Sequence, residues 1–99
     1  LVCMADDEPS FEWNATKNQS NVVKHGLAFE IAQRAFSDKA RIILEDLEHS
    51  TEAETRYFCI GKINDVVVTV RFTWRNNKIR IFGAGYWRKG KQIYEKENS

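Results

Sequence analysis

Residues 66–75 constrain the fold most, because alternate positions along this stretch are apolar without a break and the positions between them are mostly threonine and arginine. Alternation with a period of two predicts a half-buried antiparallel strand. Asn64-Asp65 precedes the stretch and Asn76-Asn77 follows it, and both pairs tolerate the positive φ angles of a two-residue hairpin loop. We therefore expect a meander of three strands over residues 57–63, 66–75 and 78–82.

The two loops determine which side chains share a face of this sheet. A loop at Asn76-Asn77 places Thr73 opposite Arg80, and a loop at Asn64-Asp65 places Thr73 opposite Arg56. Five basic side chains then lie on one face, which we expect the helices to leave uncovered: Arg56, Arg71, Arg75, Lys78 and Arg80. Like charges facing each other across strands are destabilising, so we interpret this face as an anion-binding surface. The alternative is a solvated face that carries long side chains.

Two helices are expected before the sheet. Asn14 is a suitable N-cap for a helix over residues 15–25, and Gly26 suits the left-handed position that ends such a helix. Residues 28–36 carry apolar side chains at the spacing i, i+3, i+4, i+7 and i+8, which predicts a second, amphipathic helix.

Shorter segments complete the arrangement. We expect a short edge strand over residues 11–13, a strand over residues 40–47 and a C-terminal helix over residues 87–96. With the meander, these elements predict an α+β protein with two N-terminal helices, a C-terminal helix and a roughly four-stranded antiparallel sheet.

Charge is unevenly distributed, although the net charge of the 99-residue chain is only +1. Residues 1–56 carry 6 basic and 11 acidic side chains, whereas residues 57–99 carry 9 basic and 3 acidic ones. This segregation favours a polyanion as the ligand of the C-terminal half. A chain of this length forms one domain, for which we expect residues 11–99, preceded by a disordered or over-called leader over residues 1–10.

The composition argues against several classes of function. No apolar run approaches the ~20 residues that cross a bilayer, so we expect no membrane association. Cys3 and Cys59 lack metal-ligand spacing, so we expect no metal, no cofactor and a reducing cytoplasm, with Cys59 as a small core residue. His25 and His49 are candidates for proton transfer, since histidine titrates near neutral pH; alternatively His25 caps its helix and His49 lies in a mobile loop.

The region after the last predicted strand combines basic and aromatic side chains. Tyr86 and Trp87 are followed by three basic residues, a composition suited to RNA phosphates and to stacked bases: Arg88, Lys89 and Lys91. The alternative is an exposed basic helix. Three glycines in this region are expected to let the backbone turn between strand and helix: Gly83, Gly85 and Gly90.

Several short motifs together resemble one family of small prokaryotic toxins, the BrnT family. They occur in the order Phe11-Glu12-Trp13, Lys24-His25-Gly26, Phe29-Glu30, Asp46-x-x-His49-Ser50-x-x-x-Glu54-x-Arg56, Gly61, Arg80-Ile81-Phe82 and Tyr94-Glu95. The resemblance implies a RelE-like fold and a ribonuclease activity that stops translation. It also implies a BrnA-like antitoxin, encoded next door, whose ribbon-helix-helix domain binds promoter DNA. The chain departs from the family at Phe82-Gly83-Ala84-Gly85, where members read Ile-Ser-Ala-Arg, so the family's arginine is absent.

Our leading hypothesis is a metal-independent endoribonuclease. Such cleavage needs a base for the 2′-hydroxyl proton, cations for the phosphate and an acid for the leaving oxygen. We assign the cations to Arg56 and Arg80, with Arg88 auxiliary, and proton transfer or positioning to Lys24, His25 and Glu54. RNA binding is assigned to Arg71, Arg75, Lys78, Tyr86, Arg88, Lys89 and Lys91. The alternative is a non-catalytic module that binds RNA or the antitoxin through the same basic face.

Overall fold

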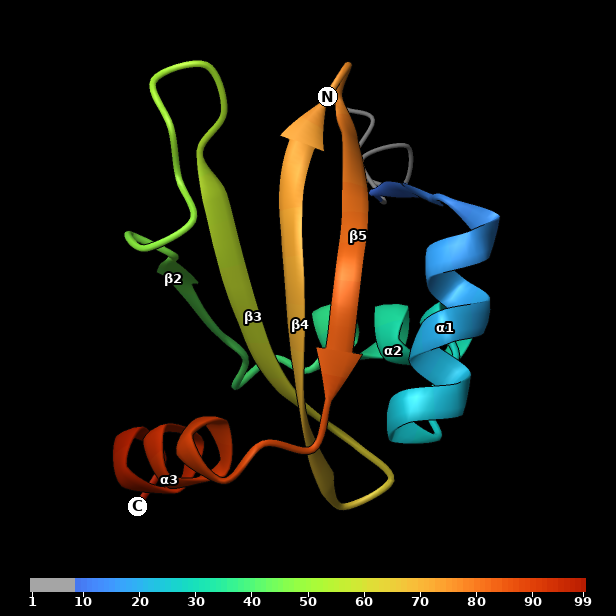
Figure 1. The fold of residues 1–99 in the computed structure, drawn as a ribbon. Coiled ribbons are helices and arrows are strands. Elements are labelled where there is room, and N and C mark those ends of the chain that lie inside the picture. Colours follow the sequence, from blue (N-terminus) through green and yellow to red (C-terminus); the bar gives the residue numbers. More distant parts are fainter. Residues whose placement is uncertain (1–8) are drawn as a thin grey trace, which may run out of the picture.

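The computed structural model of the protein describes residues 9–99 (Figure 1). Residues 1–8, which include Cys3 and most of the predicted leader, lie outside the described residues. The elements are β1 (Ser10–Trp13), α1 (Ala15–His25), α2 (Phe29–Ala32), the 3₁₀ helix η2 (Gln33–Ser37), β2 (Ile42–Glu45), β3 (Arg56–Ile63), β4 (Val66–Arg75), β5 (Lys78–Gly85) and α3 (Arg88–Glu97).

The α+β class is confirmed, but the prediction of a four-stranded antiparallel sheet is wrong. The sheet has five strands in the order β1-β5-β4-β3-β2, and it is mixed because β1 pairs with β5 in parallel. Apolar packing explains this addition, since Phe11 meets Phe36 with ring centroids 5.2 Å apart, and Trp13 meets Phe29 at 6.0 Å. The edge strand expected at residues 11–13 therefore completes the sheet.

The predicted hairpins and their register are confirmed. Asn64, Asp65, Asn76 and Asn77 have φ angles of 48°, 70°, 52° and 63°, as two-residue loops between right-twisted strands require. Thr73 lies opposite both Arg56 and Arg80. The expected basic residues of β3, β4 and β5 therefore share one face of the sheet.

The first predicted helix has the expected bounds. The side chain of Asn14 accepts a hydrogen bond from the N–H of Lys17 at 3.0 Å, and Gly26 ends α1 with a φ of 66°. A buried side chain fastens this helix to the sheet: Asn21 donates to the carbonyl oxygens of Leu27 (2.8 Å) and Ala84 (3.0 Å) and accepts from the N–H of Ala84 (3.2 Å).

The second predicted helix differs from expectation. Residues 28–36 do not form one α-helix; four residues of α2 continue into the tighter η2. The fully buried side chains, Phe29, Ala32 and Ala35, are spaced by three, which matches the three residues per turn of a 3₁₀ helix. Ile31, expected in the buried stripe, is 44% exposed.

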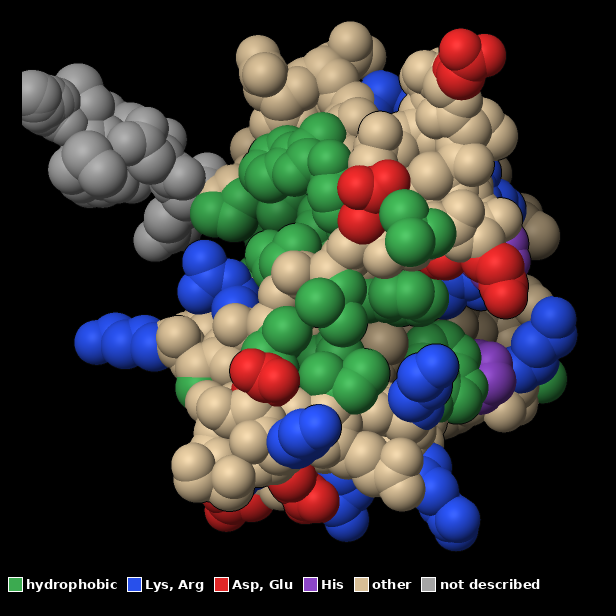
Figure 2. Space-filling model, turned by 90° about the vertical axis from the view of Figure 1, so that its left-hand side faces the viewer, with side chains coloured by type: hydrophobic (Ala, Val, Ile, Leu, Met, Phe, Trp, Pro, Cys, Tyr) green, Lys and Arg blue, Asp and Glu red, His purple; other side chains and the backbone are tan. Residues whose placement is uncertain are grey.

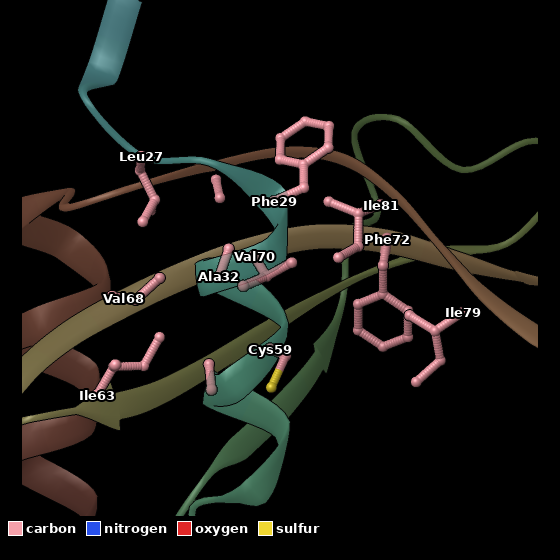
Figure 3. Packing of buried hydrophobic residues seen from close by; sticks show 12 residues of the cluster. Leu27, Phe29, Ala32, Cys59, Ile63, Val68, Val70, Phe72, Ile79 and Ile81 are labelled. Carbon is pink, nitrogen blue, oxygen red and sulfur yellow. The ribbon is translucent and has the colours of Figure 1, made fainter. Parts of the chain in front are cut away.

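Helices lie on both faces of the sheet. On one face, α2 and η2 pack against β4 and β5 to form the main core, in which Leu27, Phe29 and Ala32 approach Val70 and Ile81 (Figure 3).

On the other face, α3 covers only one end, where Tyr94 and Ile93 pack against Ile60 and Val67. The expectation that helices leave this face uncovered is therefore correct only for the end that carries Arg56 and Arg80.

The glycines of the C-terminal region do not form the turn that we expected, and two of them allow close packing. Gly83 and Gly85 lie inside β5, and Gly90 lies inside α3. A Cβ at Gly85 would lie 2.7 Å from the Trp87 ring, and one at Gly90 would lie 2.0 Å from the hydroxyl oxygen of Thr69. These glycines allow Trp87 and α3 to approach the sheet closely.

Among residues 9–99, no helix has the length and apolarity that crossing a membrane requires.

Candidate nucleic-acid interface

A row of side chains crosses three strands at the uncovered end of the sheet. Arg56 of β3 and Arg80 of β5 lie on either side of Thr73 of β4. Thr73 is 1% exposed, and its hydroxyl donates to the carbonyl of Thr55 at 2.6 Å. Two guanidinium groups are therefore carried by neighbouring strands around a fixed, buried centre.

An aromatic ring lies beneath the first of these arginines. The guanidinium carbon of Arg56 is 4.3 Å from the centre of the Phe82 ring, and the Nζ of Lys17 is 5.4 Å from the same centre. Lys17 belongs to α1, so the helix contributes a third cation to the site. We call the surface formed by Arg56, Arg71, Arg80, Phe82 and Lys17 the cationic face.

A β-bulge places Phe82 on this face. Arg71 lies opposite Gly83 and Phe72 lies opposite Ile81, so Phe82 is an extra residue in β5. A bulge leaves one residue unpaired and redirects the side chains around it. Gly83 has no side chain, and a Cβ there would lie 3.9 Å from the Cδ of Arg71. Arg71 is half-buried beside it and forms no ion pair with any residue from 9 to 99.

Glu54 connects two of the predicted arginines. Its carboxylate accepts a hydrogen bond from Nε of Arg56 at 3.1 Å and another from Nη2 of Arg75 at 2.8 Å. The hydrogen bond from Arg75, and after it the bond and charge of Arg56, hold the pKa of Glu54 below its ordinary value against the opposing effect of partial burial. Glu54 is therefore an anion that orients Arg56 and Arg75, and this environment is unfavourable for a proton carrier.

Arg80 is oriented in the same manner from the other side. Its Nη1 donates to Glu12 of β1 at 3.3 Å, and each of these side chains is about one quarter exposed. Lys78, by contrast, is exposed beside the hairpin loop, opposite Arg75.

Lys24 and His25 lie at the end of α1, away from this row. Both are exposed, and the imidazole of His25 contacts the Trp87 ring edge-on, with centroids 5.4 Å apart. Within the described part of the chain, no hydrogen bond or ion pair joins either residue to Arg56, Arg80 or Glu54.

The arginine that the resemblance led us to expect near the end of β5 is absent from this structure as from the sequence. Gly85 stands at its position, and the Trp87 ring occupies the space that a side chain at residue 85 would need. Tyr86, Arg88, Lys89 and Lys91 are exposed around this tryptophan, and Arg88 begins α3. The structure does not bring Arg88 into contact with the cationic face.

Sequence reasoning missed one oriented pair, in the loop after β2. Nδ1 of His49 lies 2.9 Å from Oδ2 of Asp46, whose carboxylate is buried. The loop is tied to Arg56, because Asp46 N–H donates to the Arg56 carbonyl (2.7 Å) and Arg56 N–H donates to Ser50 Oγ (2.8 Å). The spacing Asp46-x-x-His49-Ser50 is the signal that would have indicated it.

His49 also lines a hollow of about 510 Å³ between α3 and β2. Phe58, which lies opposite Arg71, and Trp87 contribute aromatic walls to this hollow. The hollow therefore adjoins the cationic face.

Comparison with known proteins identifies the family of the chain. A search of curated protein sequences gave no significant match. A family model, described as the ribonuclease toxin BrnT of type II toxin–antitoxin systems, matches residues 13–90. The match runs from the last residue of β1 through α1, α2, η2 and strands β2 to β5 to the start of α3. The chain therefore belongs to the BrnT family of ribonuclease toxins of type II toxin–antitoxin systems.

Proposed function

We propose that this protein is an endoribonuclease toxin that binds RNA on the cationic face and cleaves it without a metal ion. In the cytoplasm this cleavage inhibits translation, and a BrnA-like ribbon-helix-helix antitoxin neutralises it and carries the complex to promoter DNA. The observation that carries the proposal is the row Arg56–Thr73–Arg80, with Phe82 beneath Arg56. The family match supports the ribonuclease class, and membership in a type II system implies a protein antitoxin.

The row suits the transition state of phosphodiester cleavage. A pentacoordinate phosphate carries extra negative charge, and preorganised cations stabilise it without the cost of reorganising at the moment of reaction. Glu54 and Glu12 take one N–H group each from Arg56 and Arg80, and guanidinium has five N–H donors. The remaining donors of Arg56 and Arg80 are assigned to the scissile phosphate. Arg71, Arg75, Lys78 and Lys17 are assigned to neighbouring phosphates.

Proton transfer requires groups that change charge near neutral pH. His25 remains a candidate for this role and Lys24 a candidate for positioning, and both lie at the end of α1. His49 joins them, because Asp46 fixes its Nδ1 and leaves Nε2 for a substrate. Glu54 is assigned a positioning role. Tyr86, Arg88, Lys89 and Lys91 are assigned to the flanking RNA.

An assay on purified protein tests the proposal. Wild-type protein should cleave a short RNA in the presence of EDTA, and Arg80→Ala and Arg56→Ala should abolish cleavage while the melting temperature stays close to wild type. Arg34→Ala is the control, because Arg34 is an exposed arginine of η2 outside the cationic face. Cleavage retained in both arginine variants would remove the row from the mechanism.

The alternative function is a non-catalytic module that holds RNA or the antitoxin. The observation that favours it is Trp87 over Gly85, where the family carries arginine. Intact RNA together with measurable, Arg80-dependent RNA binding would support this alternative.

A further inference from the structure

The open side of β2 differs from the rest of the sheet. β2 is the last strand in the sheet order, and its only strand partner among the described residues is β3. The N–H of Asp46 donates to the carbonyl of Arg56 at 2.7 Å, which continues the β2–β3 ladder. Since hydrogen-bonded positions alternate in an antiparallel pair, the main-chain groups of Ile43 and Glu45 are directed toward the open edge.

Large apolar side chains are exposed along this edge. Leu47 is 80% exposed, Ile43 is 46% exposed and Leu44 is 39% exposed, and all three lie within five residues. Figure 2 views this side of the molecule and shows apolar side chains gathered on it, with acidic and basic groups around them. An exposed apolar edge strand is an aggregation hazard, and burial against a partner removes that hazard.

The hollow of about 510 Å³ opens beside the same strand. Leu44 and Leu47 line it together with apolar side chains of β3 and α3, among them Ile60 and Ile93. Its volume lies within the ~300–1,000 Å³ range of sites that bury a bound group. One partner segment can therefore pair its main chain with the β2 edge and insert its side chains into the hollow at the same time.

The loop that follows β2 is acidic, in contrast to the cationic face, and Lys89 of α3 lines the hollow beside it. Residues 45–54 contain five acidic side chains and no lysine or arginine. Glu54 is engaged by two arginines, and Asp46 is buried against His49. Glu45, Glu48 and Glu52 are exposed. A lysine- or arginine-containing segment of a protein would be attracted to these exposed carboxylates.

We propose that the β2 edge surface, formed by Ile43, Leu44, Glu45, Leu47 and Glu48 with the adjoining hollow, is the docking site of the protein antitoxin. An extended segment of the antitoxin adds a strand to β2, inserts apolar side chains into the hollow, and places basic side chains against Glu45 and Glu48. This inference rests on the proposed function, which supplies the antitoxin as the partner. A second copy of the chain fits less well, because pairing two β2 edges would bring the same acidic groups together.

Such docking accounts for neutralisation. The hollow is lined by His49 and by Phe58, and Phe58 lies opposite Arg71 on the cationic face. A segment inserted there covers the His49–Asp46 pair and the border of the cationic face. RNA is then excluded from these two places while the antitoxin is bound.

Two lysine substitutions test the site. Leu47→Lys places a cation where a basic partner should bind, and Val23→Lys is the matched control, since Val23 is 77% exposed on α1. The probe is the purified protein encoded by the reading frame beside the toxin gene, and binding is measured by calorimetry. We expect Leu47→Lys to weaken binding at least tenfold and Glu45→Lys to weaken it about as much, with Val23→Lys unchanged.

Two further measurements separate this inference from the proposed function. RNA cleavage by the free Leu47→Lys variant should equal that of the wild type, and the antitoxin should inhibit the variant less. Sedimentation of the chain alone should show a monomer. Equal antitoxin binding by all variants would overturn the docking site. It would also be overturned if the chain alone formed a dimer and Leu47→Lys dissociated that dimer. Absent RNA cleavage by the wild type would overturn the nuclease proposal and leave the binding result standing.

Discussion

The guanidinium group of Arg56 lies over the ring of Phe82, 4.3 Å from its centre, although β4 separates the strands that carry them. The bulge in β5 makes this contact possible, because it places Phe82 on the same face as Arg56. The ring fixes the plane of the guanidinium, while Glu54 fixes its Nε. The orientation of Arg56 is therefore set before any anion arrives.

This contact predicts the effect of Phe82→Leu. A cation–π contact at a partly exposed site contributes ~0.5–1 kcal/mol, so we expect RNA cleavage to fall about two- to fivefold with little loss of stability. Cleavage rates and thermal melting measure the two effects. Trp74→Leu is the control, since Trp74 is 54% exposed on the opposite face. Equal losses in both variants would contradict a specific role for the Phe82 ring.

Glu54→Gln is expected to destabilise the protein in a pH-dependent manner. The pKa of Glu54 is lowered, first by the hydrogen bond from Arg75 and then by Arg56. Its contribution to stability is therefore present above the unfolded pKa of ~4.3 and is lost as pH falls through the lower folded value. Because the arginines are partly exposed, we expect about 1 kcal/mol or less at pH 7. Urea unfolding at pH 7 and pH 3 measures the difference in unfolding free energy between the wild type and Glu54→Gln. An equal difference at the two pH values would contradict the prediction.

A second pair joins Asp38, the residue after η2, to α3, and it predicts sensitivity at alkaline pH. The hydroxyl of Tyr94 donates to Oδ2 of Asp38 at 2.6 Å, and this bond, with burial, raises the pKa of Tyr94 to about 12. A raised pKa contributes stability that is complete below the unfolded value of ~10 and is lost as pH rises through about 12.

We therefore expect Tyr94→Phe to cost about 1–2 kcal/mol near pH 7, with the difference shrinking above pH 10. Burial opposes ionisation of Asp38, but hydrogen bonds from Tyr94 and from the Lys62 and Ala40 N–H groups lower its pKa overall. The difference should consequently also shrink as pH falls below ~4. Unfolding free energies across this range measure it, and a difference independent of pH would contradict the assignment.

Gly90→Ala should be destabilising although alanine is the better helix former. Alanine would favour α3 by about 1 kcal/mol, but its Cβ would lie 2.0 Å from Oγ1 of Thr69. We expect a net loss of about 1–3 kcal/mol. Gly83→Ala is the control, because a Cβ there would lie 3.9 Å from Cδ of Arg71 and from Oδ1 of Asn21, which is ordinary van der Waals contact.

The double variant tests the cause. Thr69→Ala removes the clashing oxygen, and Oγ1 is a buried atom without a hydrogen-bond partner among residues 9–99. The pair Thr69→Ala/Gly90→Ala should therefore be more stable than the sum of the single changes, as measured by a double-mutant cycle in urea. Additive effects would exclude the Thr69 contact as the cause.

Structural features that depend only on residues close together in the chain could be predicted from the sequence. The loops at Asn64-Asp65 and Asn76-Asn77 need only local positive φ, so they determined the register that brings Arg56 and Arg80 beside Thr73. Asn14 and Gly26 likewise set the bounds of α1.

Features that depend on distant contacts were not predictable in this way. The parallel pairing of β1 with β5, the bulge at Phe82 and the contact of Gly90 with Thr69 each join segments far apart in the chain. The close approach of Ala35 in η2 to β3, which leaves Gly61 no room for a Cβ, is another such contact. Lys17 reaches the site only because α1 is fastened to β5.

The parallel pairing of β1 with β5 has a consequence for synthesis. Phe11 pairs with Ile79, so β1 cannot join the sheet until β5, near the end of the chain, has been synthesised. Glu12 and Lys17 likewise meet Arg80 and Phe82 only after β5 has left the ribosome. The nascent polypeptide therefore cannot form the complete cationic face until the strand near its C-terminus has left the ribosome.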